Sequence, residues 1–288
     1  MKIITYKDNN TIKAGVLDKE GVIDAEACAK AAGLKGNYNS VRAILSNPEG
    51  LECLKKAIEE TRSKAETNYK DINRLELLAP VMDPEKILGA ALNYYDACEK
   101  SKIPVPTVLQ AFGKYPNSIN VPDGKVDLAG HTVTWEGELG VVIGKNCKNV
   151  TAGDALLYVA GYTVVNDFSA MDYAQVDVQL LRGKAHDGFL PMGPVLVTAD
   201  ELGDPGNLHI TTTLNGDIVQ DSNTRGLIVD VPHLIEYFSS FMTLVPGDII
   251  ATGTPAGTAR HFDPPRFLLP GDVVEVTIEK IGSLKNIC

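Results

Sequence analysis

The chain has 288 residues, of which 44% are hydrophobic and 22% charged, and its formal net charge is −10. These proportions are typical of a globular protein and exclude a disordered one, and the length suits one large domain or two. An acidic chain without a basic cluster is not expected to bind nucleic acid or an anionic membrane surface. If the substrate is an anion, a bound cation is the simplest way to reverse the local charge.

The cysteines and the N-terminal segment both favour a reducing compartment. The five cysteines are odd in number and scattered, and none forms a C-x-x-C pair. This pattern favours free thiols over a disulfide framework or a zinc site. The first residues, MKIITYKDNN, are too polar for a signal peptide, and no apolar run reaches the length of a membrane span. We therefore expect a soluble, cytoplasmic protein.

Residues 1–75 are predicted to form a small α+β domain. Two short runs of alternating apolar residues flank an Asp-Asn-Asn cluster at residues 8–10, which predicts a β-hairpin. Asp24 is expected to cap a helix that ends near Gly33, and the spacing of apolar residues predicts a second helix over residues 48–65. Two prolines that follow this stretch mark a connector.

Residues 76–288 are predicted to form a larger domain made mostly of strands. Many short runs rich in β-branched residues are separated by turn residues, among them LYVAGYTVVNDF, LHITTTL and DVVEVTI. Asn215-Gly216 lies between two such runs and predicts a tight hairpin. The same Pro-Gly-Asp turn precedes strands at residues 246–248 and 270–272. The fold class is therefore α+β, mostly β.

Three carboxylates form a candidate metal site. Glu136 and Glu138 are two residues apart in an apolar stretch, so both face the same side if the stretch is a strand. Asp167 follows another apolar strand. Together they would supply the hard oxygen ligands that suit Mg²⁺ or Mn²⁺ rather than zinc. The alternatives are a solvated sheet face for the glutamates and a turn cap for Asp167.

A lysine and a glycine-rich loop are the other candidates for chemistry. Lys184 lies in LRGKAHDGFLPMGP, whose glycines and prolines indicate a shaped loop. The segment TGTPAG, residues 252–257, follows a strand, and its backbone amides and Thr254 are suited to hold a carboxylate. The alternative for Lys184 is a solvated surface lysine.

Other catalytic patterns are missing from the sequence. It contains no P-loop, no dinucleotide-binding glycine motif in a strand–helix context and no G-x-S-x-G. The five histidines show no metal-ligand spacing, and His209 and His233 are interpreted as structural.

Over residues 85–288 the chain resembles the fumarylacetoacetate hydrolase family. The resemblance rests on ordered blocks of sequence: LNYYDA, F-x-K at Phe112 and Lys114, WEGELGVVIGK, GYTVVNDFSAMD, GKAHDGFLPMGP, LNGDIVQDSNT, PGDIIATGTPAG and GDVVEVTIEKIGSLKN. The resemblance implies a mixed β-sandwich roll preceded by a small N-terminal domain, and a homodimer.

The resemblance also implies roles for individual residues. The family's Mg²⁺ or Mn²⁺ ligands fall on Glu136, Glu138 and Asp167, its active-site lysine on Lys184 and its G-T-P threonine on Thr254. With Thr254 we group three further expected substrate-binding residues, Gly253, Tyr162 and Gln175.

The chain departs from the family pattern in the lid. Many members carry N-Y-x-x-H-x-x-E, whose histidine and glutamate activate water; here Ala97 stands in place of the histidine and the glutamate is one residue early, at Glu99. That shift rotates a helical side chain by about 100°. Glu99 is therefore the one catalytic base that the matching stretch offers. A second departure is Met171, where A-R-D is common.

These residues predict a divalent-metal enzyme that acts on a small anionic 2-oxo acid or 1,3-dicarbonyl compound. The leading hypothesis is C–C bond hydrolysis, as in acylpyruvate hydrolases, through a metal-stabilised enolate. The alternative is a decarboxylase, tautomerase or dehydratase with the same metal site, which loss of the lid histidine favours. A further alternative is a catalytically silent binding protein.

Overall fold

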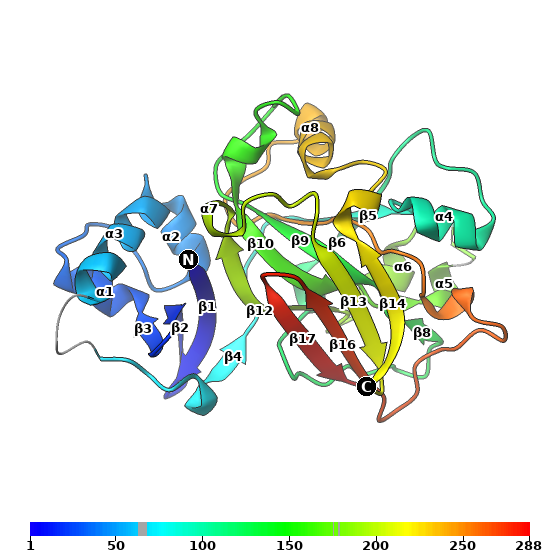
Figure 1. The fold of residues 1–288 in the computed structure, drawn as a ribbon, viewed down its shortest axis with the longest axis horizontal. Coiled ribbons are helices and arrows are strands. Elements are labelled where there is room, and N and C mark those ends of the chain that lie inside the picture. The colour runs from blue at the N-terminus through cyan, green and yellow to red at the C-terminus, as the bar shows by residue number, and fades with distance from the viewer. Residues whose placement is uncertain (63–67, 175, 178) are drawn as a thin grey trace.

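The computed structural model describes residues 1–62, 68–174, 176–177 and 179–288. A small N-terminal unit, blue in Figure 1, lies beside a larger β-rich body, and helix α4 lies at the opposite end of the molecule. The N-terminal unit contains β1 (Lys2–Asp8), β2 (Thr11–Asp18), β3 (Gly21–Asp24), α1 (Ala25–Ala31), α2 (Val41–Ser46) and α3 (Gly50–Arg62).

The remaining elements build the larger body. The first part contains β4 (Glu76–Leu78), β5 (Ile87–Ala91), α4 (Tyr95–Ser101), β6 (Gln110–Lys114), β7 (Ile119–Asn120), β8 (Val133–Thr134), β9 (Gly137–Ile143), β10 (Val159–Asn166), β11 (Ser169–Ala170), α5 (Met171–Ala174), α6 (Leu181–Lys184) and β12 (Leu190–Thr198). The second part contains α7 (Ala199–Leu202), β13 (His209–Leu214), β14 (Asp217–Asn223), α8 (Val231–Phe241), β15 (Ile249–Ala251), β16 (Val273–Ile278) and β17 (Gly282–Ile287).

Local sequence signals account for the N-terminal unit. Asn9 and Asn10 adopt positive φ angles of 46° and 66° in the turn between β1 and β2, which confirms the predicted hairpin. The Asp24 carboxylate accepts a 2.9 Å hydrogen bond from the amide of Ala27 and caps α1, as predicted. The predicted second helix corresponds to α3, and its expected last residues, 63–65, lie outside the described residues.

One large sheet runs through both units. Its strand order is β3-β2-β1-β12-β10-β9-β15-β5-β6, and β4 pairs with β1. Strand β1 pairs with β12 at Lys2↔Val197 and Ile3↔Leu196, so the small unit extends the sheet of the larger one. Strands from both sides of the predicted division at residues 75 and 76 thus share one sheet, and the division itself stays a prediction.

A second sheet, ordered β14-β13-β16-β17, packs against the first. Asn215 and Gly216 have φ angles of 53° and 90° in the turn between β13 and β14, as the hairpin signal predicts. Buried residues from the two sheets, such as Val141, Val164 and Val276, belong to one apolar core. This two-sheet roll is the expected fold class. In the part of the chain that the structure describes, no helix is long and apolar enough to cross a membrane.

The close approach of β10 to β12 depends on Gly161. A Cβ atom at this position would lie 2.2 Å from the backbone oxygen of Val197, which cannot move without disturbing the ladder. We expect Gly161→Ala to lower the free energy of unfolding by about 1–3 kcal/mol in urea titrations. Gly113→Ala is the control, because its Cβ would come no nearer than 3.8 Å to a neighbouring atom. Equal stability of the two variants would contradict the packing argument.

Candidate active site

The pairing of β9 with β10 brings the three predicted carboxylates together. Ligand oxygens of Glu136, Glu138 and Asp167 all lie within 4.8 Å of one another. Asn166 pairs with Gly137, and the amide of Asp167 donates to the carbonyl of Glu136 at 2.9 Å. Glu138 is 2% exposed and Asp167 is fully buried, whereas Glu136 is partly exposed. A solvated sheet face therefore does not describe this cluster.

Two lysines from different elements, β6 and α6, contact the cluster. The Lys184 ammonium lies 2.5 Å from Asp167 Oδ2 and 2.8 Å from Glu136 Oε2. Lys114, at the end of β6, lies 2.6 Å from Asp167 Oδ1. Both lysines are buried, so Lys184 is not a solvated surface residue. Asp167 thus holds one ammonium on each of its carboxylate oxygens.

Burial and neighbouring charges set the protonation of these groups. Burial, with the adjacent Asp167 and Glu136 carboxylates, raises the pKa of Glu138 well above its usual value. Burial also opposes ionisation of Asp167, but the two ammonium groups outweigh it and lower the pKa of that carboxyl. The Asp167 and Glu136 carboxylates likewise overcome the burial of Lys184 and raise its pKa. In the absence of a cation Glu138 therefore favours its neutral form, and a bound cation would stabilise its ionised form.

The donor set fits a hard divalent cation. Mg²⁺ and Mn²⁺ take carboxylate oxygens, and no described cysteine or histidine belongs to the cluster. Glu136, Glu138 and Asp167 would hold such an ion. Lys184 would then lie beside it, since its ammonium already contacts two of the three carboxylates.

The TGTPAG loop supports the cluster from the neighbouring strand β15. The amide of Gly253 donates to Glu138 Oε2 at 2.7 Å, so this backbone group is directed at the carboxylate cluster. Thr254 Oγ1 donates to the carbonyl of Gly137 at 3.0 Å and accepts from Gln220 Nε2 at 2.8 Å. Gly253 has a φ angle of 103°, which only glycine adopts readily.

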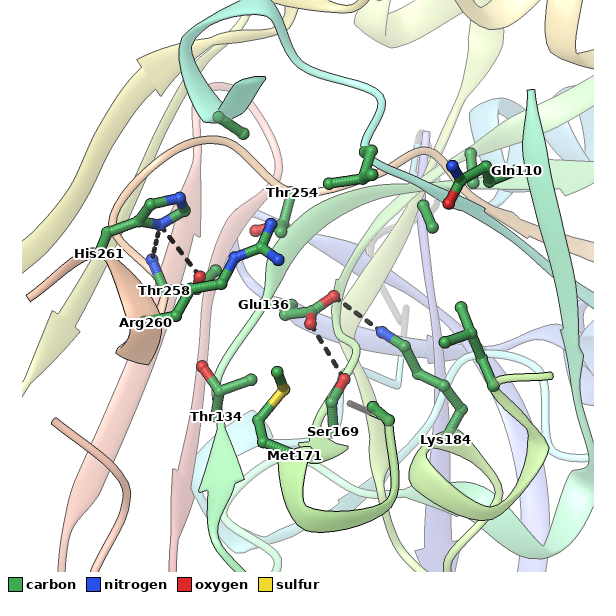
Figure 2. Close-up of a pocket in the computed structure, with 16 residues that line it drawn as sticks. Gln110, Thr134, Glu136, Ser169, Met171, Lys184, Thr254, Thr258, Arg260 and His261 are labelled. Atoms are coloured by element: carbon green, nitrogen blue, oxygen red, sulfur yellow. Dashed lines mark hydrogen bonds and ion pairs between the residues drawn. The ribbon is translucent and has the colours of Figure 1, made fainter. Parts of the chain in front are cut away.

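A cavity of about 210 Å³ opens beside the cluster, as Figure 2 shows. A space of this size suits a small metabolite. Of the predicted site residues, Glu136, Lys184 and Thr254 line it. Other polar residues that line it were not singled out in the sequence: Gln110, Thr134, Ser169, Thr258, Arg260 and His261.

Two predicted site residues, Glu99 and Tyr162, lie away from both the cavity and the carboxylate cluster. Glu99 is exposed and lines a separate surface recess with Asp221 and Arg225. Tyr162 is 1% exposed and lies within the apolar core. Gln175 lies outside the described residues.

Helix α4 covers the cavity with an apolar residue and is fastened by polar contacts. Ala97, at the place where the lid histidine was expected, is buried and lines the cavity. The Asp96 carboxylate accepts hydrogen bonds from Ser222 Oγ at 2.7 Å and from the amide of Ala256 at 3.1 Å. Ser101, the last residue of α4, lies 2.9 Å from His261 Nε2.

The imidazole of His261 connects α4 to the TGTPAG loop through hydrogen bonds and is not free to act as a base. Its Nδ1 accepts from the amides of Gly257 and Thr258, each at 3.1 Å, so Nε2 carries the proton and donates to Ser101 Oγ. Burial and the Arg260 guanidinium lower the pKa of His261 to about 4. The ring is therefore neutral at pH 7, and its only lone pair is already used.

The two-sheet roll and its Glu-x-Glu and Asp cluster define an enzyme of the fumarylacetoacetate hydrolase type. Residues 86–287 match the profile of the fumarylacetoacetate (FAA) hydrolase C-terminal family, and the chain belongs to this family.

The similar proteins include several different enzymes. The chain is 41% identical to the mitochondrial oxaloacetate tautomerase fahd2 of Xenopus laevis over 83% of this chain and 76% of the relative. Fumarylacetoacetate hydrolase from Exiguobacterium antarcticum has a TM-score of 0.82 at 30% identity, covering 100% of this chain and 98% of that one. Maleylpyruvate hydrolase from Sphingobium sp. SYK-6, solved with manganese(II) and pyruvate, has a TM-score of 0.81 at 27% identity over the same shares, 100% and 98%.

We expect Glu138→Gln to abolish stabilisation by metal, because Glu138 is the most isolated of the three carboxylates from cationic partners. At ~100 times its Kd, a bound ion stabilises the native state by about 2.7 kcal/mol. Thermal unfolding with and without Mn²⁺ should show a rise in Tm for the unchanged protein and none for the variant. Glu99→Gln, outside the cavity, should retain the rise. If Mn²⁺ raised the Tm of Glu138→Gln as much as that of the unchanged protein, Glu138 would not be a metal ligand.

The lowered pKa of His261 predicts a pH-dependent contribution to stability. Between pH 6.5 and about 4 the unfolded histidine takes up a proton and the folded one does not, so the stabilisation is full above pH 6.5 and decreases as the pH falls. His261→Asn, which loses the bond to Ser101, should be less stable than the unchanged protein by about 1 kcal/mol at pH 7.5. Urea titrations at pH 7.5 and 5 should show this gap narrowing at the lower pH. A gap that does not change with pH would refute the assignment.

Proposed function

We propose that the protein is a divalent-metal-dependent enzyme that interconverts the keto and enol forms of a small 2-oxo acid. The observation that carries this proposal is the cluster of Glu136, Glu138 and Asp167, which is ion-paired with Lys184 beside a small cavity. A Mg²⁺ or Mn²⁺ ion bound there would act as a Lewis acid on the 2-oxo group and make the neighbouring C–H bond more acidic.

Lys184 stabilises negative charge as it develops on the substrate oxygen. Its raised pKa keeps the side chain an ammonium, so the lysine donates hydrogen bonds and does not act as a base. Its carboxylate neighbours Asp167 and Glu136 fix its position before substrate arrives. A preorganised donor of this kind costs no reorganisation during the reaction.

The lid favours tautomerisation over C–C hydrolysis, which the sequence placed first. Both reactions move a proton, but they place different demands on the site. In enolisation the C–H bond that the metal would make more acidic gives its proton to a solvent water in the open cavity, and the enol takes a proton back from water in the reverse direction. Hydrolysis needs in addition a positioned base that activates water within hydrogen-bond reach of the reacting carbonyl. Ala97 supplies no such group, Glu99 lines a different recess, and the acceptor atom of His261 is already engaged. The oxaloacetate tautomerase activity in the name of the Xenopus relative supports this ranking.

Hydrolysis is the second candidate function, because the maleylpyruvate hydrolase that shares this fold was solved with manganese and pyruvate. A catalytically silent binding protein is disfavoured. Three carboxylates whose oxygens lie within 4.8 Å of one another repel, and a pure scaffold would gain from replacing them with apolar residues. The homodimer and the cytoplasmic location stay predictions.

The test follows the tautomerisation of oxaloacetate by the loss of enol absorbance, with Mn²⁺ present and after its removal by a chelator. We expect metal-dependent acceleration that Lys184→Met reduces by at least ~100-fold, the scale of losing one preorganised donor. Glu99→Gln should stay within about twofold of the unchanged enzyme, and hydrolysis of acylpyruvates should be slow by comparison.

Two outcomes would contradict the proposal. One is an unchanged protein that does not accelerate the reaction in the presence of Mn²⁺. The other is rapid acylpyruvate hydrolysis that Glu99→Gln abolishes, which would restore the hydrolase hypothesis with Glu99 as the base.

A further inference from the structure

One cation in the cavity has no partner in the described part of the chain. Arg260 belongs to a short 3-10 helix, η5 (Ala259–His261), and lines the cavity. Its guanidinium forms no hydrogen bond or ion pair with any residue that the structure describes, and it is exposed. Figure 2 shows Arg260 and Lys184 entering from opposite sides, with the Glu136 carboxylate between them.

The backbone that carries Arg260 is held on both sides. The amide of Ala259 donates to Thr134 Oγ1 at 2.9 Å, and the carbonyl of Ala259 accepts from the amide of Arg266 at 3.0 Å. The imidazole of His261 is fixed by the amides of Gly257 and Thr258. The base of the side chain is therefore immobilised, while the charged end remains free to bind a ligand.

The charges of the cavity indicate what that ligand is. Among the described residues that line it, the charged side chains are Glu136, Lys184 and Arg260. Glu136 is already engaged by Lys184 at 2.8 Å and by Ser169 Oγ at 3.0 Å, which leaves Arg260 without a counter-ion. In a chain of net charge −10, Arg260 is therefore a cation at the wall of a substrate-sized cavity that none of the described carboxylates contacts.

Building on the proposed function, we propose that Arg260 binds a second carboxylate of the substrate, remote from the 2-oxo acid group. A dicarboxylic 2-oxo acid, such as the oxaloacetate in the name of the Xenopus relative, has a second carboxylate for this site. One carboxylate and the oxo group lie toward the Glu138 end, and the distal carboxylate meets the guanidinium fork, which matches a carboxylate with two parallel hydrogen bonds. Met171, Ala97 and Leu180 line the same cavity and supply its apolar walls.

The kinetic test compares two substrates of equal chain length, 2-oxobutanedioate and 2-oxobutanoate, with the Mn²⁺-loaded enzyme. Arg260→Met should lower kcat/KM for the dicarboxylate by about 10–100-fold and leave the monocarboxylate within about twofold. Arg260→Lys, which keeps the charge but loses the fork, should fall between the two. Arg225→Met, which removes an exposed arginine that lines a different surface recess, is the control and should change neither value.

A binding test separates this inference from the proposed function. Calorimetry of the Mn²⁺-loaded protein measures oxalate, which reaches only the metal end, and 2-hydroxybutanedioate, which carries the distal carboxylate. Arg260→Met should weaken the second by about tenfold and leave oxalate unchanged. If neither oxo acid reacts but this pattern holds, the proposed function fails and the carboxylate site stands.

Three results would overturn the inference. Unchanged kinetics and binding in Arg260→Met would show that Arg260 does not contact the ligand, even if tautomerisation is confirmed. Equal losses for both oxo acids, or weaker binding of oxalate, would place its effect at the metal end. The unchanged protein should bind 2-hydroxybutanedioate more tightly than 2-hydroxybutanoate. Equal affinities would show that the cavity has no site for a second carboxylate.

Discussion

The site depends on the burial of Asp167 between two ammonium groups. Lys114 from β6 and Lys184 from α6 each bind one of its oxygens, and Asp167 itself continues β10 where that strand pairs with the segment of Glu136. A buried carboxylate without such partners would take up a proton instead of staying charged. The pair of lysines therefore keeps one anionic ligand in place at neutral pH, and it ties three distant segments to the same point.

The same arrangement leaves Glu138 as the carboxylate that a bound cation would stabilise most. Its hydrogen bond comes from the neutral amide of Gly253, whereas the lysines are held by the other two carboxylates. Removing one partner from a buried charge cluster lowers the free energy of unfolding, because the remaining charge is left without compensation. A substitution at one residue of the cluster therefore changes the energy of the others. The positive φ of Gly253 belongs to this coupling, because it turns the backbone amide toward Glu138.

The sequence predicted what depends on short-range pattern and missed what depends on tertiary contact. Period-two spacing placed Glu136 and Glu138 together, and turn residues located both hairpins. The F-x-K motif contained Lys114, but no local signal shows that its side chain crosses to Asp167. Arg260 and His261 follow the TGTPAG loop in a stretch without periodicity, and their roles arise only when η5 packs against β8 and α4. Glu99 matched a motif in sequence, yet its helix turns it toward another surface.

The order of charges along the cavity links the lid to the metal site. Arg260 is exposed, Glu136 partly exposed and Glu138 buried, so an entering anion meets a cation before it meets the carboxylates. Without Arg260 and a bound metal, three carboxylates in an acidic protein would repel an anionic substrate such as the proposed 2-oxo acid. His261 follows Arg260 in η5 and donates a hydrogen bond to Ser101 of α4. It therefore connects the segment that carries Arg260 to the lid helix. An imidazole that holds the lid cannot also accept a proton from water, and this separation of roles is the physical reason to expect enolisation without hydrolysis.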